Sequence, residues 1–129
     1  MTEEQINELL ASIISMYAPS FGRSINKRVA SKLATLSVEH LFENMPDNSY
    51  TLAKTALAKC GTILEESDNT IAGVVLSGAA NMNPAFVLLM IERNNIYMKT
   101  SAKEGLIKQH MAEKAIEIFK LALAATEDK

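Results

Sequence analysis

The sequence predicts an all-α fold: a single compact bundle of about six helices around a buried, apolar helical hairpin. Apolar residues recur at the three- and four-residue spacing of amphipathic helices through most of the chain. Two capping-box patterns, which mark helix N-termini, lie far apart. An uncharged run extends from Ile71 to Ile91 and contains Asn83 and Pro84, residue types that begin a new helix. The chain has 129 residues and no visible repeat or linker, so we expect one domain over residues 1–129.

The first helix is expected to begin after Thr2. Thr2 and Gln5 have the spacing of a capping box, in which each side chain accepts a hydrogen bond from the backbone of the other residue. Pro19 predicts the end of this helix, because proline disfavours helical geometry in the residue before it. The apolar residues between these signals fall on one stripe: Ile6, Leu9, Leu10, Ile13, Ile14 and Tyr17.

Two further helices are expected in the next part of the chain. The second runs from about Phe21 to Asn44, and the third runs from about Tyr50 to Glu66. Residues 46–49 between them have the composition of a turn. Gly61 lies inside the third helix, where a glycine costs about 1 kcal/mol relative to alanine. We therefore expect tertiary packing to stabilise that helix.

The central hairpin is predicted from the uncharged run. Its two arms, residues 69–80 and 85–91, are apolar or small on every side, which is typical of helices enclosed by protein. Asn83 followed by Pro84 is a capping residue and a first-turn proline, so it predicts the start of the second arm. These two residues also argue against a membrane span, because polar groups and a helix break are expensive in lipid.

A last amphipathic helix is expected to begin near Thr100 or Ser101. Ser101 and Glu104 form the second capping box. The apolar surface of this helix is wide, and such excess surface is commonly buried against a second copy of the chain. We therefore expect a homo-oligomer, most simply a homodimer.

Composition and charge narrow the function class. The formal net charge of −2 and the pI near 5.7 argue against a general nucleic-acid or anionic-membrane binder. Cys60 is the only cysteine, so we expect neither an internal disulfide nor a cysteine-built metal site. The acidic N-terminal residues lack the basic character of a targeting signal, and together with the lone thiol they favour a cytoplasmic protein.

Each of the two histidines is followed three residues later by a glutamate: His40 by Glu43, and His110 by Glu113. On a helix this spacing places both side chains on one face. Dimetal helical bundles use paired histidine and glutamate ligands, although in the opposite order along the chain. A metal or haem protein that uses His40 and His110 is therefore one alternative function. The leading expectation is that the protein has no cofactor.

Four basic residues form two rows on the second predicted helix. Arg23 and Lys27 are four residues apart, as are Arg28 and Lys32, and residues 9–38 contain no acid. Such a surface can bind a phosphate or an acidic partner, particularly close to a helix N-terminus. A solvated basic face is the simpler interpretation of the same residues.

Small and flexible side chains in the predicted hairpin can leave room for an apolar ligand. Gly73 and Ser77 are small, while Met82, Met90 and Met111 offer adaptable walls. Close packing of the core explains small residues equally well. A sensor domain that holds an apolar small molecule in a helical core is therefore the first alternative function.

No catalytic motif is visible in the sequence. The glycines match neither a dinucleotide fingerprint nor a phosphate loop, and the metalloprotease and nucleophile-elbow patterns are absent. We therefore expect a non-enzymatic interaction or regulatory protein that acts through protein–protein contacts as a homo-oligomer.

Overall fold

The computed structural model describes residues 2–22, 25–77, 83–102 and 110–127. Within these ranges the chain forms four α-helices and five β-strands, so the predicted all-α helical bundle is wrong and the fold combines α and β structure. In chain order the elements are α1 (Glu3–Tyr17), the short 3-10 helix η1 (Ala18–Phe21), α2 (Lys27–Thr35), β1 (Val38–Phe42), α3 (Ser49–Cys60), β2 (Thr62–Glu66), β3 (Thr70–Ser77), β4 (Asn83–Glu92), β5 (Asn95–Ser101) and α4 (Met111–Glu127).

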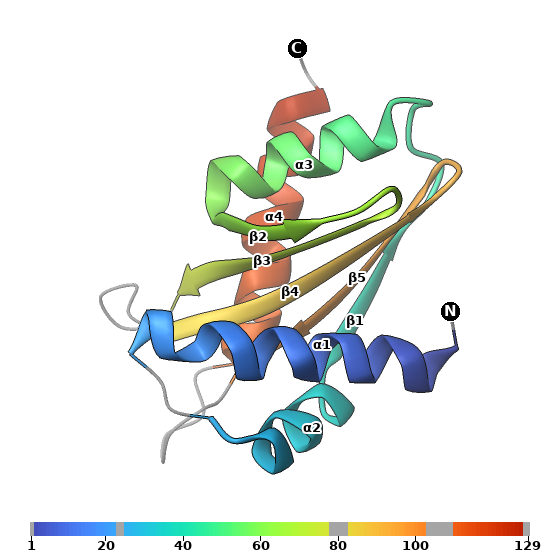
Figure 1. Ribbon diagram of the computed structural model, residues 1–129. Coiled ribbons are helices and arrows are strands. Elements are labelled where there is room, and N and C mark those ends of the chain that lie inside the picture. Colours follow the sequence, from blue (N-terminus) through green and yellow to red (C-terminus); the bar gives the residue numbers. More distant parts are fainter. Residues whose placement is uncertain (1, 23–24, 78–82, 103–109, 128–129) are drawn as a thin grey trace.

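The strands form one antiparallel sheet between two helical layers (Figure 1). The strand order across the sheet is β1-β5-β4-β3-β2, and every neighbouring pair is antiparallel. Helices α1 and α2 cover one face of the sheet, and α3 and α4 cover the other. In the described part of the chain, β1 and β2 are therefore the two edges of the sheet.

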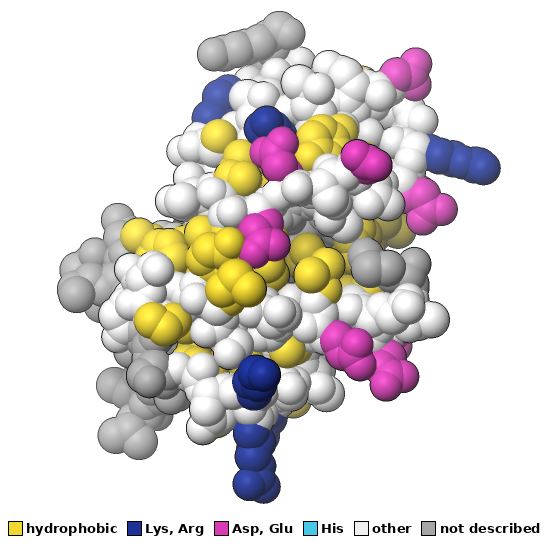
Figure 2. Space-filling model, in the orientation of Figure 1, with side chains coloured by type: hydrophobic (Ala, Val, Ile, Leu, Met, Phe, Trp, Pro, Cys, Tyr) yellow, Lys and Arg dark blue, Asp and Glu magenta, His cyan; other side chains and the backbone are white. Residues whose placement is uncertain are grey.

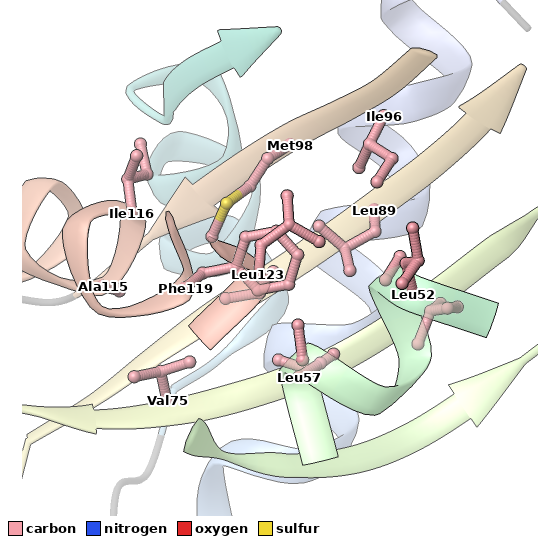
Figure 3. Packing of buried hydrophobic residues seen from close by; sticks show 14 of the residues in the cluster. Leu52, Leu57, Val75, Leu89, Ile96, Met98, Ala115, Ile116, Phe119 and Leu123 are labelled. Carbon is pink, nitrogen blue, oxygen red and sulfur yellow. The ribbon is translucent and has the colours of Figure 1, made fainter. Parts of the chain in front are cut away.

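Each face of the sheet has its own hydrophobic core, and β4 contributes to both. Val87 and Leu89 belong to the core beneath α3 and α4, whereas Phe86 and Leu88 belong to the core beneath α1 and α2. Successive side chains of a strand point to opposite faces, so a central strand buried on both faces is apolar at every position. Figure 3 shows the first core, where Phe119 of α4 lies among side chains of the sheet.

The uncharged run forms strands rather than the predicted helical hairpin. β3 and β4 pair along their length, from Thr70 opposite Met90 to Ser77 opposite Asn83. The prediction is wrong because a continuous apolar run is compatible both with an enclosed helix and with a strand buried on two faces. Within the described ranges, no helix has the length and apolar character needed to cross a bilayer.

Three other predicted helices are wrong over part of their length, because the structure has strands within the predicted ranges. The second gives way to β1 after α2, and the third ends at Cys60, before β2. Gly61 separates α3 from β2, where a Cβ atom would collide with the Val74 carbonyl oxygen. Thr100 and Ser101, where the last helix was expected to begin, belong to β5, and Ser101 Oγ donates to the Leu33 carbonyl at 2.7 Å. Glu104, the other residue of the predicted capping box, lies outside the described residues.

The first predicted helix is confirmed, together with its capping box. Gln5 N donates to Thr2 Oγ1 at 3.1 Å, and Thr2 N donates to Gln5 Oε1 at 2.8 Å. Leu10, Ile13 and Ile14 of its apolar stripe are buried against the sheet. Helix α4 likewise confirms the later part of the last predicted helix.

The turn between β4 and β5 is tied to the segment that follows β1. Asn94 Nδ2 donates to the Met45 carbonyl at 2.6 Å, and Met45 N donates to the Asn94 carbonyl at 2.7 Å. Ser49 Oγ donates to the Arg93 carbonyl at 2.8 Å. These bonds fix the C-terminal end of the edge strand β1 beside the β4–β5 hairpin.

Candidate functional site

A groove runs along α1, between this helix and the sheet. It consists of two adjoining hollows of about 640 and 350 Å³, and we call it the α1 groove. Asn69, in the turn between β2 and β3, lines both hollows. Figure 2 shows a band of hydrophobic side chains across the middle of the molecule, with acidic and basic side chains above and below it. The apolar lining comes from α1 and four strands: Ile6, Leu9, Ile13, Leu41, Ala72, Leu88, Met90 and Tyr97.

Near one end of the α1 groove, where Glu65 lines it, a hydrogen bond joins α1 to the edge strand β2. The Tyr17 hydroxyl donates to Glu65 Oε2 at 2.7 Å. This bond raises the pKa of the Tyr17 phenol, because loss of the proton would place two negative charges side by side. The contact therefore joins the last turn of α1 to the sheet at near-neutral pH.

The other end of the α1 groove reaches the edge strand β1. Leu41, which is 47% exposed, lines the groove and also a separate hollow of about 390 Å³ next to α4. We call this separate hollow, on the α4 side of the sheet, the α4 hollow. Because β1 pairs only with β5 among the described residues, its outer backbone has no sheet partner. The α4 hollow is lined by Leu41, Phe42, Glu43, Met45, Lys120, Leu123, Ala124 and Glu127.

Carboxylates outnumber cations around the α1 groove and the α4 hollow. Lys120 is the one described cation in their lining, and its Nζ lies 3.9 Å from Glu117. The described carboxylates in the lining are Glu43, Glu65, Glu66, Glu92 and Glu127. Glu66 is paired with Lys54, whose Nζ lies 3.0 Å away. The other carboxylates leave an apolar floor with an electronegative rim, which attracts cationic groups.

Lys99 is a buried cation that supports the edge strand β1. Its side chain is 2% exposed, and its Nζ lies 3.2 Å from Oε1 of Glu39, whose side chain is 45% exposed. A hydrogen bond from Tyr97, and then the contact with Lys99, lower the pKa of Glu39. Burial, and then the bond to Glu39, raise the pKa of Tyr97. Glu39 therefore stays ionised beside the open edge of the sheet.

The opposite edge of the sheet carries features that hinder strand addition. The pairing of β2 shifts between Ile63 and Glu65, which is a β-bulge. Glu65 accepts from Tyr17, and Glu66 Oε1 lies 3.0 Å from Lys54 Nζ. Bulges and charged side chains both discourage a further strand from pairing with an edge. By contrast, β1 pairs with β5 at five consecutive positions without a shift.

The residues predicted to form an apolar cavity are spread over both faces of the sheet. Gly73 lies in β3, where its neighbours leave no room for a Cβ atom. Met90 lines the α1 groove on the opposite face, and Met111 is buried at the start of α4. Ser77 ends β3, and Met82 lies outside the described residues.

The predicted basic rows fall on α2. Lys27, Arg28 and Lys32 are exposed, and Arg23 lies outside the described residues. The Asn26 side chain caps the helix by accepting from the Val29 backbone at 2.9 Å. Part of the N-terminal hydrogen-bonding capacity of α2 is therefore already used by the chain itself.

The two histidine–glutamate pairs lie in different settings. His110 Nδ1 and Glu113 Oε2 are 3.0 Å apart, and this hydrogen bond lowers the pKa of Glu113. His40 lies on β1 instead of a helix, and the centroids of its ring and the Phe42 ring are 4.5 Å apart. Glu43 follows the strand. Across the ranges that the structure describes, no three His, Cys, Asp or Glu side chains are arranged to hold a metal ion.

Leu41 and Tyr97, which line the wide end of the α1 groove, were not singled out by the sequence patterns. One signal in the sequence does point to the sheet that brings them together. Arg93 and Asn94 separate two mainly apolar runs, and such a two-residue connection is typical of a β-hairpin.

No protein-family model matches the chain, and no curated protein matches it. The fold and the site together define a three-layer α/β/α domain with an apolar, electronegative groove that opens at one sheet edge.

Proposed function

We propose that this protein is a non-enzymatic interaction protein whose α1 groove binds a segment of another protein rich in apolar and basic residues. The observation that carries the proposal is the combination of an apolar floor and an electronegative rim in one depression. When a partner covers side chains such as Ile6 and Met90, the binding free energy becomes more favourable by about 25 cal/mol for each Å² of apolar surface removed from water. The surrounding carboxylates favour the approach of cationic partners over acidic ones.

The shape of the groove favours a peptide segment over a compact small molecule. Ile6 and Ile13 line it at two points on α1, and they are about 10 Å apart at the helical rise of about 1.5 Å per residue. An extended peptide covers that distance with about three residues. Further residues of the segment would continue past Leu41 at the open end.

Selection from a displayed library of random peptides tests this proposal. We expect the selected peptides to combine apolar residues with lysine or arginine, and to bind more weakly as salt concentration rises. Ile6→Arg should weaken their binding by about tenfold, since it places bulk and positive charge in the groove. The matched control Met16→Arg changes an exposed residue of the same helix outside the groove, and its binding should match the wild type. Failure to select peptides, or equal binding to Ile6→Arg, would contradict the proposal.

Self-association is a second proposal, supported by Leu121. This side chain is 71% exposed on α4, and burial against a second copy would remove it from water. Native mass spectrometry should show a dimer for the wild-type protein and a monomer for Leu121→Lys. A monomeric wild-type protein would contradict this proposal.

We also propose that the protein works in the cytoplasm. Cys60 is a free cysteine in a half-buried position, which is consistent with a reducing compartment. Fractionation of the source cells, with detection of the native protein, would test its location.

A further inference from the structure

We propose that the part of the bound segment that continues past Leu41 joins the edge strand β1 as an additional strand of the sheet, with alternate side chains directed toward the Leu41 end of the α1 groove and toward the α4 hollow. This inference rests on the proposed function, because it specifies how the partner of the same surface is held. It commits to one occupant: an extended segment of another protein with apolar residues at its centre and basic residues beside them.

The backbone of β1 provides the first part of the evidence. Its five residues pair regularly with β5 on one side, and no described residue pairs with its other side. Unpaired backbone groups along an edge strand can bind an extended segment through main-chain hydrogen bonds. The bulge of β2 makes the opposite edge a poorer acceptor.

The two hollows provide the second part. Leu41 faces the α1 groove and its neighbour Phe42 lines the α4 hollow, so apolar space flanks β1 on both faces of the sheet. A strand added beside β1 would lie about 4.8 Å away, and its successive side chains would point to alternate faces. Each hollow would therefore receive one of the two sets of side chains. Leu41, at the junction of the hollows, would be covered by the added strand.

Charge favours a partner segment over a second copy of this chain. In a two-fold antiparallel pair of β1 strands centred on His40, the two Glu39 residues would be diagonal neighbours about 7–8 Å apart. Such a pair would also bring Glu43, Glu92 and Glu127 of both copies close to the interface between the two β1 strands, where their negative charges would repel each other. A segment that carries lysine or arginine would meet these carboxylates with opposite charge.

Backbone methylation of a peptide provides a direct test. The probe is a synthetic copy of the most enriched peptide from the library selection, methylated at one backbone nitrogen at a time. Only every second amide of an added strand points toward β1. We therefore expect about a tenfold loss of affinity at alternate positions and little change at the positions between them. A profile without this two-residue period would overturn the proposal.

Two alanines at neighbouring positions of α4 provide a matched pair of variants. Ala124 lines the α4 hollow, whereas Ala125 is exposed outside it, so neither change to arginine disturbs the core. Ala124→Arg should weaken binding of the same peptide by about tenfold, since it fills the hollow with positive charge. Ala125→Arg should bind as the wild type does. Equal binding by both variants would overturn strand addition.

The pattern of results separates the two levels of the proposal. Peptides that lose affinity for Ile6→Arg, but show neither the alternating methylation profile nor sensitivity to Ala124→Arg, would uphold the groove and refute strand addition. Failure of Ile6→Arg to affect any selected peptide would refute both. Sedimentation equilibrium tests a second copy as occupant: a wild-type dimer that Ala124→Arg dissociates and Ala125→Arg preserves would overturn the proposed partner segment.

Discussion

Lys99 Nζ lies 3.2 Å from Glu39 Oε1, and the two residues sit directly opposite each other in the β1–β5 pair. The lysine is buried while the glutamate is half-exposed. An ammonium group removed from water depends on its charged partner, so the contact matters more to Lys99 than to Glu39. It also connects the open edge of the sheet to the protein interior.

Replacement of Glu39 should lower the free energy of unfolding more than replacement of Lys99 does. Glu39→Gln is expected to lower the free energy of unfolding by about 1–3 kcal/mol, because it leaves a buried ammonium group without a charged partner. Lys99→Met should cost less, since it removes the buried charge and keeps an apolar side chain of similar length. Urea denaturation of both variants measures the difference. Equal losses would show that the buried charge is not the cause.

The stability of the protein should depend on pH through Glu39. Its pKa in the folded protein lies below the ordinary value of 4.5, because of the hydrogen bond from Tyr97 and the contact with Lys99. A lowered folded-state pKa stabilises the protein above the unfolded-state value, and that contribution is lost as pH falls through the lowered value. Between about pH 5 and pH 2, Glu39→Gln should therefore reduce the slope of unfolding free energy against pH. Glu8→Gln, on the exposed face of α1, serves as the control, and identical slopes for Glu39→Gln and wild type would refute the assignment.

Two glycines should respond differently to alanine. At Gly61 a Cβ atom would collide with the Val74 carbonyl oxygen, which is backbone and cannot move without disturbing the β2–β3 pair. At Gly22 no described residue other than its chain neighbours has an atom within 4 Å of such a Cβ, so the φ of +75° is the feature that opposes the change. We expect Gly61→Ala to cost more than about 2 kcal/mol and Gly22→Ala about 1 kcal/mol. Thermal unfolding measures both, and a reversed order would contradict the packing described for Gly61.

Adjacent leucines on β4 should behave as independent core residues. Leu88 is 1% exposed and Leu89 is 0% exposed, yet they belong to cores on opposite faces of the sheet. Replacement of either with alanine is expected to cost about 2–4 kcal/mol. The double variant should lose nearly the sum, because the two side chains belong to clusters that have no described residue in common. Chemical denaturation tests this, and strong coupling between neighbours would contradict the two-sided burial of β4.

Local sequence signals predicted the helical ends of the chain better than its centre. Thr2 and Gln5 define the start of α1, and the helical stripe near Phe119 agrees with α4. The short edge strand β1 was hidden because Leu33, Leu36 and His40 happen to follow helical spacing across the end of α2. The five residues of β1 alternate in burial but not in hydropathy, because Glu39 and His40 are both polar and Leu41 and Phe42 are both apolar. The sequence therefore contains no period-two signal that could outweigh that stripe.

The candidate site depends on contacts that no local pattern contains. Leu41 and Tyr97 lie opposite each other on β1 and β5, although they are far apart in the sequence. Their proximity follows from the sheet order, in which the first strand pairs with the last. Ile6 joins them only because α1 packs across the same face. Without the strand assignment, none of these three residues could be grouped with the others.

The difference between the two edge strands, β1 and β2, also limits how many further strands the sheet can accept. A sheet that offers a template on both sides can grow without limit, as fibrils do. Here the bulge between Ile63 and Glu65 hinders the pairing of a further strand with β2. At the opposite edge, β1 pairs with β5 without a shift, and its outer side has no strand partner among the described residues. Recruitment at β1 would thus end at one partner segment for each copy of this chain instead of continuing into a polymer.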